Sequence, residues 1–242
     1  MIPFSDLARA AFCPRQLYYA RRDDDRSVPP EARARIELAF RYPDLVDAPD
    51  RRLRRLPIRR SPAAYRRNLA QLRERSIYDR LVDPFRTRAF VSGRDCHGTV
   101  HKVLAPVTED GDDAHGDEAH AADPRGDEAH VDGPPIPVLV SPGEPPDRGV
   151  WEPQSVRAVA AAKALAWEHE RPIPRTFVEY PTVGVVREVE LTVRRKATYR
   201  RALRAVRAID GPPSRVDDAR CEECDYRDRC GVGRRSLRSL LG

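Results

Sequence analysis

Four of the five cysteines lie near the two ends of the chain, and their spacing constrains the fold more than any other feature. Cys13 is followed by a proline and an arginine, and Cys221, Cys224 and Cys230 form a C-x2-C-x5-C pattern about 200 residues later. Three thiolates in one short segment can converge on one centre and leave a fourth ligand to be supplied. Cys13 is the natural candidate, so the spacing predicts a fold that brings both ends to one metal site.

Four thiolates can hold either a tetrahedral zinc ion or an iron-sulfur cluster. A structural zinc usually takes its ligands as two short pairs, whereas here three come from one segment and one from far upstream, which favours a cluster. Two other interpretations stay open. Cys13 can be a small buried residue of an amphipathic helix, or the cysteines can form disulfides, which a chain without a secretory segment does not favour. Cys96 has no matching partner in the sequence and is interpreted as incidental.

The length of 242 residues suits one substantial domain over 1–242, which ends in a cysteine-containing segment at 213–242. No apolar run approaches the roughly 20 residues needed to span a bilayer, and the first residues do not form a leader pattern. We therefore expect a soluble, cytoplasmic protein with no membrane partner.

The charge of the chain is unevenly distributed. Residues 107–133 hold ten Asp or Glu and one Arg, and because this segment contributes −9 to the net charge of +6, the rest of the chain carries +15. Such a basic body suits a nucleic-acid backbone, through steering and counterion release. The alternative is an ordinary solvated arginine surface.

The acidic segment contains the sequence Gly-Asp-Glu-Ala-His twice, at 116–120 and 126–130. Its histidines and carboxylates suggest a metal site. However, literal duplication without apolar periodicity is more typical of a disordered insertion, which we predict over 107–135.

Hydrophobic periodicity predicts alternating elements and an α/β fold with a mixed sheet. The predicted helices cover 5–22, with Ser5 as the cap, 31–40, 63–81, 152–170 and 195–209, and 47–62 is predicted to be irregular. The predicted strands cover 88–92, 98–105, 136–140, 176–180 and 183–192.

Several short motifs follow one another in an informative order. They are Ser5-Asp-Leu, Phe12-Cys13-Pro-Arg-Gln-Leu-Tyr-Tyr19, Gly98-x-x-His101, Pro142-Gly143, Gly149-Val-Trp151 with Gln154, and the C-x2-C-x5-C tail. Together they resemble the RecB-type nucleases of the PD-(D/E)xK superfamily, and are most similar to the CRISPR-associated protein 4 family, which acts in antiviral defence. The resemblance implies a restriction-endonuclease-like mixed sheet flanked by helices. It also implies a 4Fe-4S cluster held by Cys13, Cys221, Cys224 and Cys230, which would join the two ends.

The resemblance is weakest where the chemistry should occur. Members of the superfamily cut DNA with one or two divalent ions held by an Asp and a Glu, while a Lys positions the attacking water. The matching positions here are His101, Leu139 and Ser141, so Mg²⁺ would find almost no oxygen ligands. His101 could bind a softer ion such as Mn²⁺ or Zn²⁺. The glutamine motif keeps Gln154, but the tyrosine expected four positions later is Ala158.

Three hypotheses follow. The first is a degenerate, iron-sulfur member of the family that binds single-stranded DNA or DNA ends, or assists a CRISPR integrase during adaptation. The second is an active exonuclease using Mg²⁺ or Mn²⁺ with displaced ligands, for which Glu144, Asp147 and Glu152 are candidates. The third is an unrelated zinc-stapled binding module.

Overall fold

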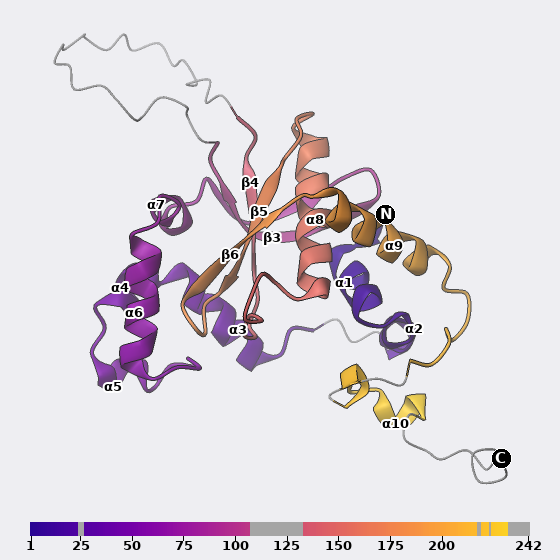
Figure 1. Ribbon diagram of the computed structural model, residues 1–242, viewed down its shortest axis with the longest axis horizontal. Helices are drawn as coiled ribbons and strands as arrows, with labels where there is room; N and C mark the ends of the chain where they lie inside the picture. Colours follow the sequence, from indigo (N-terminus) through magenta and orange to yellow (C-terminus); the bar gives the residue numbers. More distant parts are fainter. Residues whose placement is uncertain (24–26, 107–132, 217–218, 223, 232–242) are drawn as a thin grey trace.

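A mixed β-sheet lies between two layers of helices (Figure 1). The computed structural model describes residues 1–23, 27–106, 133–216, 219–222 and 224–231. Most of the insertion predicted at 107–135, both of its repeats and the chain after residue 231 lie outside the described residues. Among the described residues, no helix has the length and apolar character needed to cross a membrane.

The sheet confirms the predicted α/β class. Its strands are β1 (Ile2–Pro3), β2 (Arg86–Ser92), β3 (Cys96–Leu104), β4 (Ile136–Val140), β5 (Arg175–Tyr180) and β6 (Val185–Glu190). The order is β1-β3-β4-β5-β6, with β2 paired to β3. The pairs β1–β3 and β4–β5 are parallel and the others are antiparallel. All five predicted strands are present, and the two-residue β1 was not predicted.

One face of the sheet is covered by α1 (Phe4–Phe12), α8 (Glu152–Glu168) and α9 (Val193–Arg207). The buried side of α8 is rich in alanine, which lets neighbouring backbones approach closely. A Cβ added at Gly93 would lie 2.6 Å from the Cα of Ala164. Lys163 and Trp167, which share this helix, are exposed.

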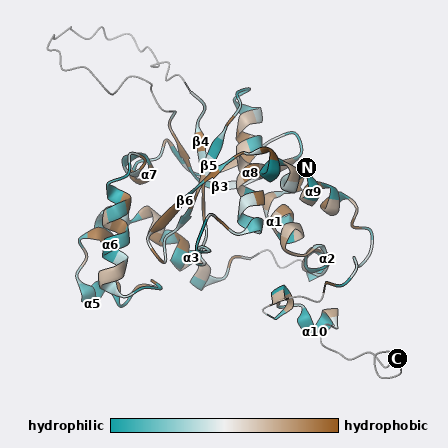
Figure 2. Cartoon of the chain, viewed as in Figure 1, coloured by the Kyte–Doolittle hydropathy of each residue, from teal (hydrophilic) through white to brown (hydrophobic). Residues whose placement is uncertain are grey.

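The opposite face is covered by short helices that form a second core with the sheet. They are α3 (Pro30–Glu37), η1 (Leu38–Phe40), α4 (Tyr42–Val46), α5 (Asp50–Leu53), α6 (Pro62–Arg73) and α7 (Tyr78–Val82). In Figure 2, α6 shows both teal, hydrophilic and brown, hydrophobic residues, as expected of a helix with one face on a core.

The single helix predicted over 63–81 is wrong, because the chain turns between α6 and α7. Leu72 and Ile77 are both buried. Five residues at about 100° each would place them on different sides of one straight helix. The turn lets both side chains reach the same core. The segment 47–62, predicted to be irregular, contains the short helix α5.

The helix predicted over 5–22 is also wrong, because it is broken at Cys13. α1 ends at Phe12, α2 covers Pro14–Asp23, and Cys13 between them has an extended backbone with φ −161° and ψ 117°. A residue that precedes proline is disfavoured in helical geometry, which explains the corner. The N-cap of α1 is Pro3 and not Ser5. Cys13 therefore occupies the corner between two helices, not a helix interior.

A buried ion pair crosses the sheet within the second core. The ammonium of Lys102 on β3 lies 3.1 Å from the carboxylate of Glu179 on β5 and donates a 2.7 Å hydrogen bond to the carbonyl of Ala39. The rings of Phe40 and Tyr42 lie 5.1 and 5.2 Å from the same nitrogen. This contact ties η1 to the central strands.

Candidate functional site

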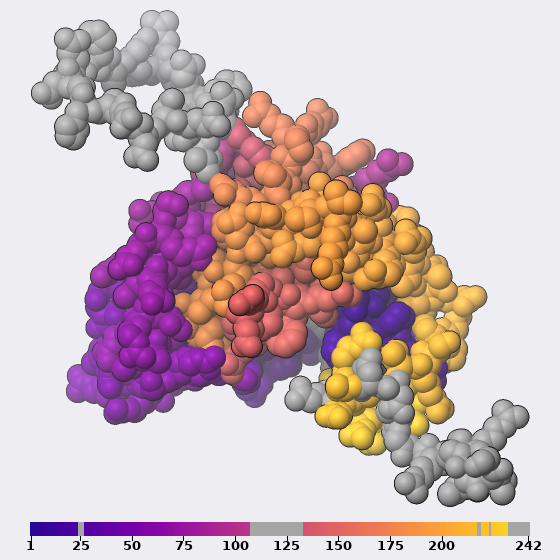
Figure 3. Space-filling model, in the orientation of Figure 1, coloured from indigo at the N-terminus to yellow at the C-terminus, as the bar shows by residue number. Residues whose placement is uncertain are grey.

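The four terminal cysteines line one small cavity between α2 and the C-terminal segment. Cys13 approaches from the corner before α2, and Cys221 from the 3-10 helix η2 (Ala219–Cys221). Cys230 ends the short helix α10 (Arg227–Cys230), and Cys224 lies between these two elements. In Figure 3 the yellow C-terminal segment lies against the indigo N-terminal helices. The predicted meeting of the two ends is therefore present in the fold.

Polar and aromatic contacts hold the C-terminal segment on α2. Arg15 donates a 2.5 Å hydrogen bond to the carbonyl of Pro213, and Arg229 pairs with Asp23 at 2.5 Å. The ring of Tyr19 stacks on that of Tyr226 with centroids 5.7 Å apart. The Cys-Pro-Arg motif thus forms the corner between α1 and α2, and its arginine also binds the C-terminal segment.

The donor set around the cavity fits an anionic metal-thiolate group. Arg15, Arg220 and Arg227 line the cavity with the cysteines, and Gln16 points its side-chain amide at the sulfur of Cys224, 3.9 Å away. Hydrogen bonds and cations around cysteine sulfur are typical outer partners of such groups. Among the described residues, no three Cys, His, Asp or Glu side chains are grouped closely enough to hold a single metal ion.

The positions matched to the nuclease motif lie where β3 and β4 diverge. β2 pairs along one edge of β3, so β1 and β4 share the other edge, β1 at residues 96–97 and β4 at 102–104. His101 on β3 lies in the gap between them, and its Nδ1 accepts a 3.0 Å hydrogen bond from the backbone N–H of Val140. Because the two strands diverge here, the N–H of Val140 on β4 has no backbone acceptor on β3, and the imidazole of His101 accepts its hydrogen bond instead.

This hydrogen bond limits what His101 can bind. Because Nδ1 is occupied as an acceptor, the neutral ring carries its proton on Nε2 and offers a donor there. Burial is the main cause that lowers the pKa of His101, and together with the charges of Arg157, Arg88 and Lys102 it brings the pKa to about 3. A neutral imidazole whose acceptor nitrogen is in use is a poor ligand for a divalent metal ion.

The other motif-matched residues lie together beside His101. Leu139 is buried in the first core, and the hydroxyl oxygen of Ser141 accepts a 2.9 Å hydrogen bond from the Nε2 of Gln154. The Oε1 of Gln154 accepts from the N–H of Trp151 at 3.2 Å and from the hydroxyl of Tyr180 at 3.1 Å. Ser141 and Gln154 are thus in direct contact. The sequence analysis missed Tyr180, which joins them from β5.

The Gly98 that opens this motif has a packing role. A Cβ at this position would lie 2.5 Å from the ring of Phe4, which covers the strand. The glycine is therefore explained by the close approach of α1.

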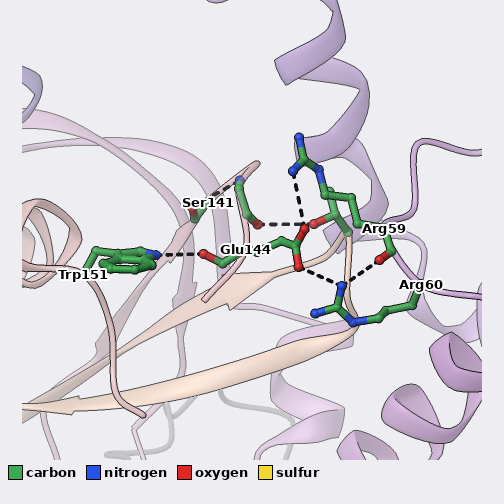
Figure 4. Close-up of polar contacts among 7 residues, drawn as sticks. Arg59, Arg60, Ser141, Glu144 and Trp151 are labelled. Carbon is green, nitrogen blue, oxygen red and sulfur yellow. Dashed lines mark hydrogen bonds and ion pairs between the residues drawn. The ribbon is translucent and has the colours of Figure 1, made fainter. Parts of the chain in front are cut away.

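The candidate displaced ligands are engaged elsewhere. Glu144 lies between two guanidinium groups, 3.4 Å from Arg59 and 2.7 Å from Arg60, and its backbone carbonyl accepts from the indole of Trp151 (Figure 4). The hydrogen bond from Arg60 is the main cause that lowers the pKa of Glu144. Glu152 pairs with Arg201 at 3.6 Å. Asp147 does not line the cavity that Ser141 and Gln154 share.

Cys96 is separate from the other cysteines. It is buried at 1% exposure, and its sulfur lies 3.4 Å from the hydroxyl of Tyr199. Burial raises the pKa of this thiol, which therefore stays protonated and acts as a core residue.

Two functional candidates were not singled out from the sequence. Arg157 follows Gln154 by three residues and lines the same cavity, and this i, i+3 spacing on a helix was the available signal. The pairing of Lys102 with Glu179 had no local signal, because 77 residues separate them.

The chain matches no protein-family model, and no curated protein matches it.

A first prediction concerns acid stability. The pKa of His101 falls from 6.5 to about 3 in the folded protein, so between these values the unfolded chain binds a proton that the folded protein does not. The contribution of the neutral His101 side chain to the free energy of unfolding is fully present above about pH 6.5. It is lost as the pH falls toward 3, by up to about 1.4 kcal/mol per pH unit. His101→Gln keeps an acceptor for Val140 and should flatten this part of the curve. The measurement is urea unfolding at several pH values. Equal slopes for variant and wild type would contradict the assignment.

Proposed function

We propose that this protein is a nucleic-acid-binding member of the RecB-type nuclease scaffold whose cutting site is degenerate and whose two ends are joined by a 4Fe-4S cluster. The observation that carries the proposal is the chemistry at the divergence of β3 and β4. Residues at the three motif positions lie there, yet none is a carboxylate, and Arg157 has the largest effect of the charged groups that lower the pKa of His101. Such a site repels divalent cations and attracts phosphate.

The cluster is supported by the cysteine cavity. A single zinc ion with bonds of about 2.3 Å needs sulfur atoms about 3.8 Å apart, whereas a cluster separates its ligands further. All four cysteines line one cavity, and four thiolates are the ligand set of a 4Fe-4S cluster. Cys13, Cys221, Cys224 and Cys230 would hold the cluster, which would fix the ends of the chain.

The ligand class follows from charge. Outside 107–133 the chain carries a net charge of +15, and nearly all its basic residues are arginines, which bind phosphate in a bidentate manner. Single-stranded DNA or a DNA end is the proposed ligand. Within a CRISPR adaptation complex, a bound integrase would be the proposed protein partner.

The test is binding of a labelled single-stranded oligonucleotide at several salt concentrations, followed by a sizing gel with Mg²⁺ or Mn²⁺. The logarithm of affinity should fall with that of salt, by about 0.7 per phosphate contacted, and the strand should keep its length. An uncharged peptide nucleic acid of the same sequence is the control and should not bind. Metal-dependent shortening would replace the proposal with an active exonuclease, and absence of binding would refute it.

A further inference from the structure

Arg157 on α8 is a charged side chain without a counterion. Its Nε is buried and has no hydrogen-bond partner, and among the described residues the guanidinium forms no ion pair. Burial lowers the pKa of Arg157, yet an arginine keeps its charge at neutral pH. A buried charge is normally paired, because removing an ion from water without a partner is costly. Arg157 is half-buried, so its unpaired guanidinium is available to an anion at this position.

The cavity beside Arg157 has the size and chemistry to hold one. Its volume is about 160 Å³, enough for several water molecules, and among the described residues no Asp or Glu lines it. Ser141 and Gln154 line it together with apolar side chains from α1, β4 and β5. Both charge and space favour a small anion.

The polar atoms of the cavity are oriented as donors. The oxygen of Ser141 already accepts hydrogen bonds from Gln154 at 2.9 Å and from the N–H of Gly143 at 3.4 Å. No described residue accepts its hydroxyl proton, which is free for a ligand. Gln154 is fixed by the N–H of Trp151 and the hydroxyl of Tyr180, so its amide hydrogens face Ser141. A guanidinium and a hydroxyl donor at one cavity match the oxygen atoms of a phosphate.

We propose that this cavity binds a phosphate oxyanion, with Arg157 as its counterion and Ser141 as a hydrogen-bond donor. The inference that the phosphate belongs to a nucleic-acid chain rests on the proposed function. The inference that the cavity binds an oxyanion does not.

The first experiment measures the melting temperature of three proteins with inorganic phosphate: wild type, Arg157→Met and the control Arg200→Met, whose arginine is exposed on α9. Phosphate should raise the melting temperature of wild type and control by several degrees and that of Arg157→Met by less than about one degree. Without phosphate, Arg157→Met should melt at or above the wild-type temperature, because it removes a half-buried charge that has no ion pair among the described residues. Equal shifts in all three proteins, or none, would overturn the proposal.

Ser141→Ala gives a second, independent test. It removes one donor and leaves the charge, so phosphate affinity should fall about tenfold while the protein stays folded. Unchanged affinity would contradict the assigned role of Ser141, even if Arg157→Met failed to fold.

The last experiment identifies the source of the phosphate. Wild-type protein should bind a 5′-phosphorylated single strand more tightly than its 5′-hydroxyl counterpart, and Arg157→Met should lose about tenfold in affinity for the phosphorylated strand. If inorganic phosphate binds but neither strand does, the oxyanion site stands and the proposed nucleic-acid function fails. If both strands bind but phosphate has no effect on any variant, the site is refuted and the function stands.

Discussion

A Cys224→Ser variant is expected to purify colourless, with its N-terminal helices and C-terminal segment no longer held together. Cys224 lines the cavity with Cys13, Cys221 and Cys230, so its loss would remove one of the four proposed cluster ligands. The proposed cluster would close a loop of about 200 residues, and the chain-entropy relation for a cross-link of that length gives about 5 kcal/mol of stabilisation. Without the cluster, few apolar contacts would hold the C-terminal segment in place, because none of the described residues of η2 and α10 is buried.

The measurement combines the visible absorbance spectrum, thermal unfolding and limited proteolysis. In the variant, the spectrum should lose its cluster band, the melting temperature should fall by at least about 10 °C, and cleavage should begin near both ends. Cys96→Ala is the matched control, since Cys96 lies in the core away from the cavity, and it should keep its colour. A coloured Cys224→Ser protein with normal stability would refute the cluster assignment.

A Glu179→Gln variant is expected to lose about 3–5 kcal/mol of unfolding free energy, because it leaves the ammonium of Lys102 buried without a counterion. The pair lies in the second core with both side chains at most 1% exposed. Burial raises the pKa of Glu179 and lowers that of Lys102, so desolvation outweighs the attraction between them. The pair therefore fixes η1 against β3 and β5 more than it adds stability.

Urea unfolding of three variants separates these effects. Glu37→Gln removes the exposed ion pair of Glu37 with Arg88 and should cost at most about 1 kcal/mol. The double variant Lys102→Met with Glu179→Leu should recover most of the stability that Glu179→Gln loses, because no charge stays buried. If the free energy of unfolding of Glu179→Gln lies within about 1 kcal/mol of the wild-type value, water reaches the pair more easily than the structure indicates.

Local sequence patterns were sufficient for β2 to β6, but not for the two-residue β1. The run Ile136–Val140 is apolar throughout and is buried on both faces, and its predicted bounds agree with β4. The predicted segments 88–92 and 176–180 also lie within β2 and β5. Strand prediction succeeded because apolar, β-branched runs end abruptly at glycine and proline in this chain.

Helices were less predictable where tertiary packing or proline broke them. Periodicity alone joined α1 to α2 across Cys13, although Pro14 signalled the corner. It also joined α6 to α7, because the requirement to bury Ile77 arises only when the second core is assembled.

The candidate site was partly predictable. Of the positions matched to one motif, Ser141 and Gln154 are in contact, and the cysteine spacing anticipated that Cys13 lies beside the C-terminal segment. The role of His101 as a partner for the N–H of Val140 depends on how two strands diverge, and no sequence pattern encodes it. The unpaired state of Arg157 likewise appears only in three dimensions.

The most direct test of the account is the metal content of the full-length protein purified without oxygen. We expect about four iron and four sulfide per chain and a broad absorbance band near about 400 nm, from a sample that binds single-stranded DNA and leaves its length unchanged with Mn²⁺. A colourless protein with about one zinc per chain would contradict the cluster, and with it the nuclease-type ancestry on which the proposed function depends.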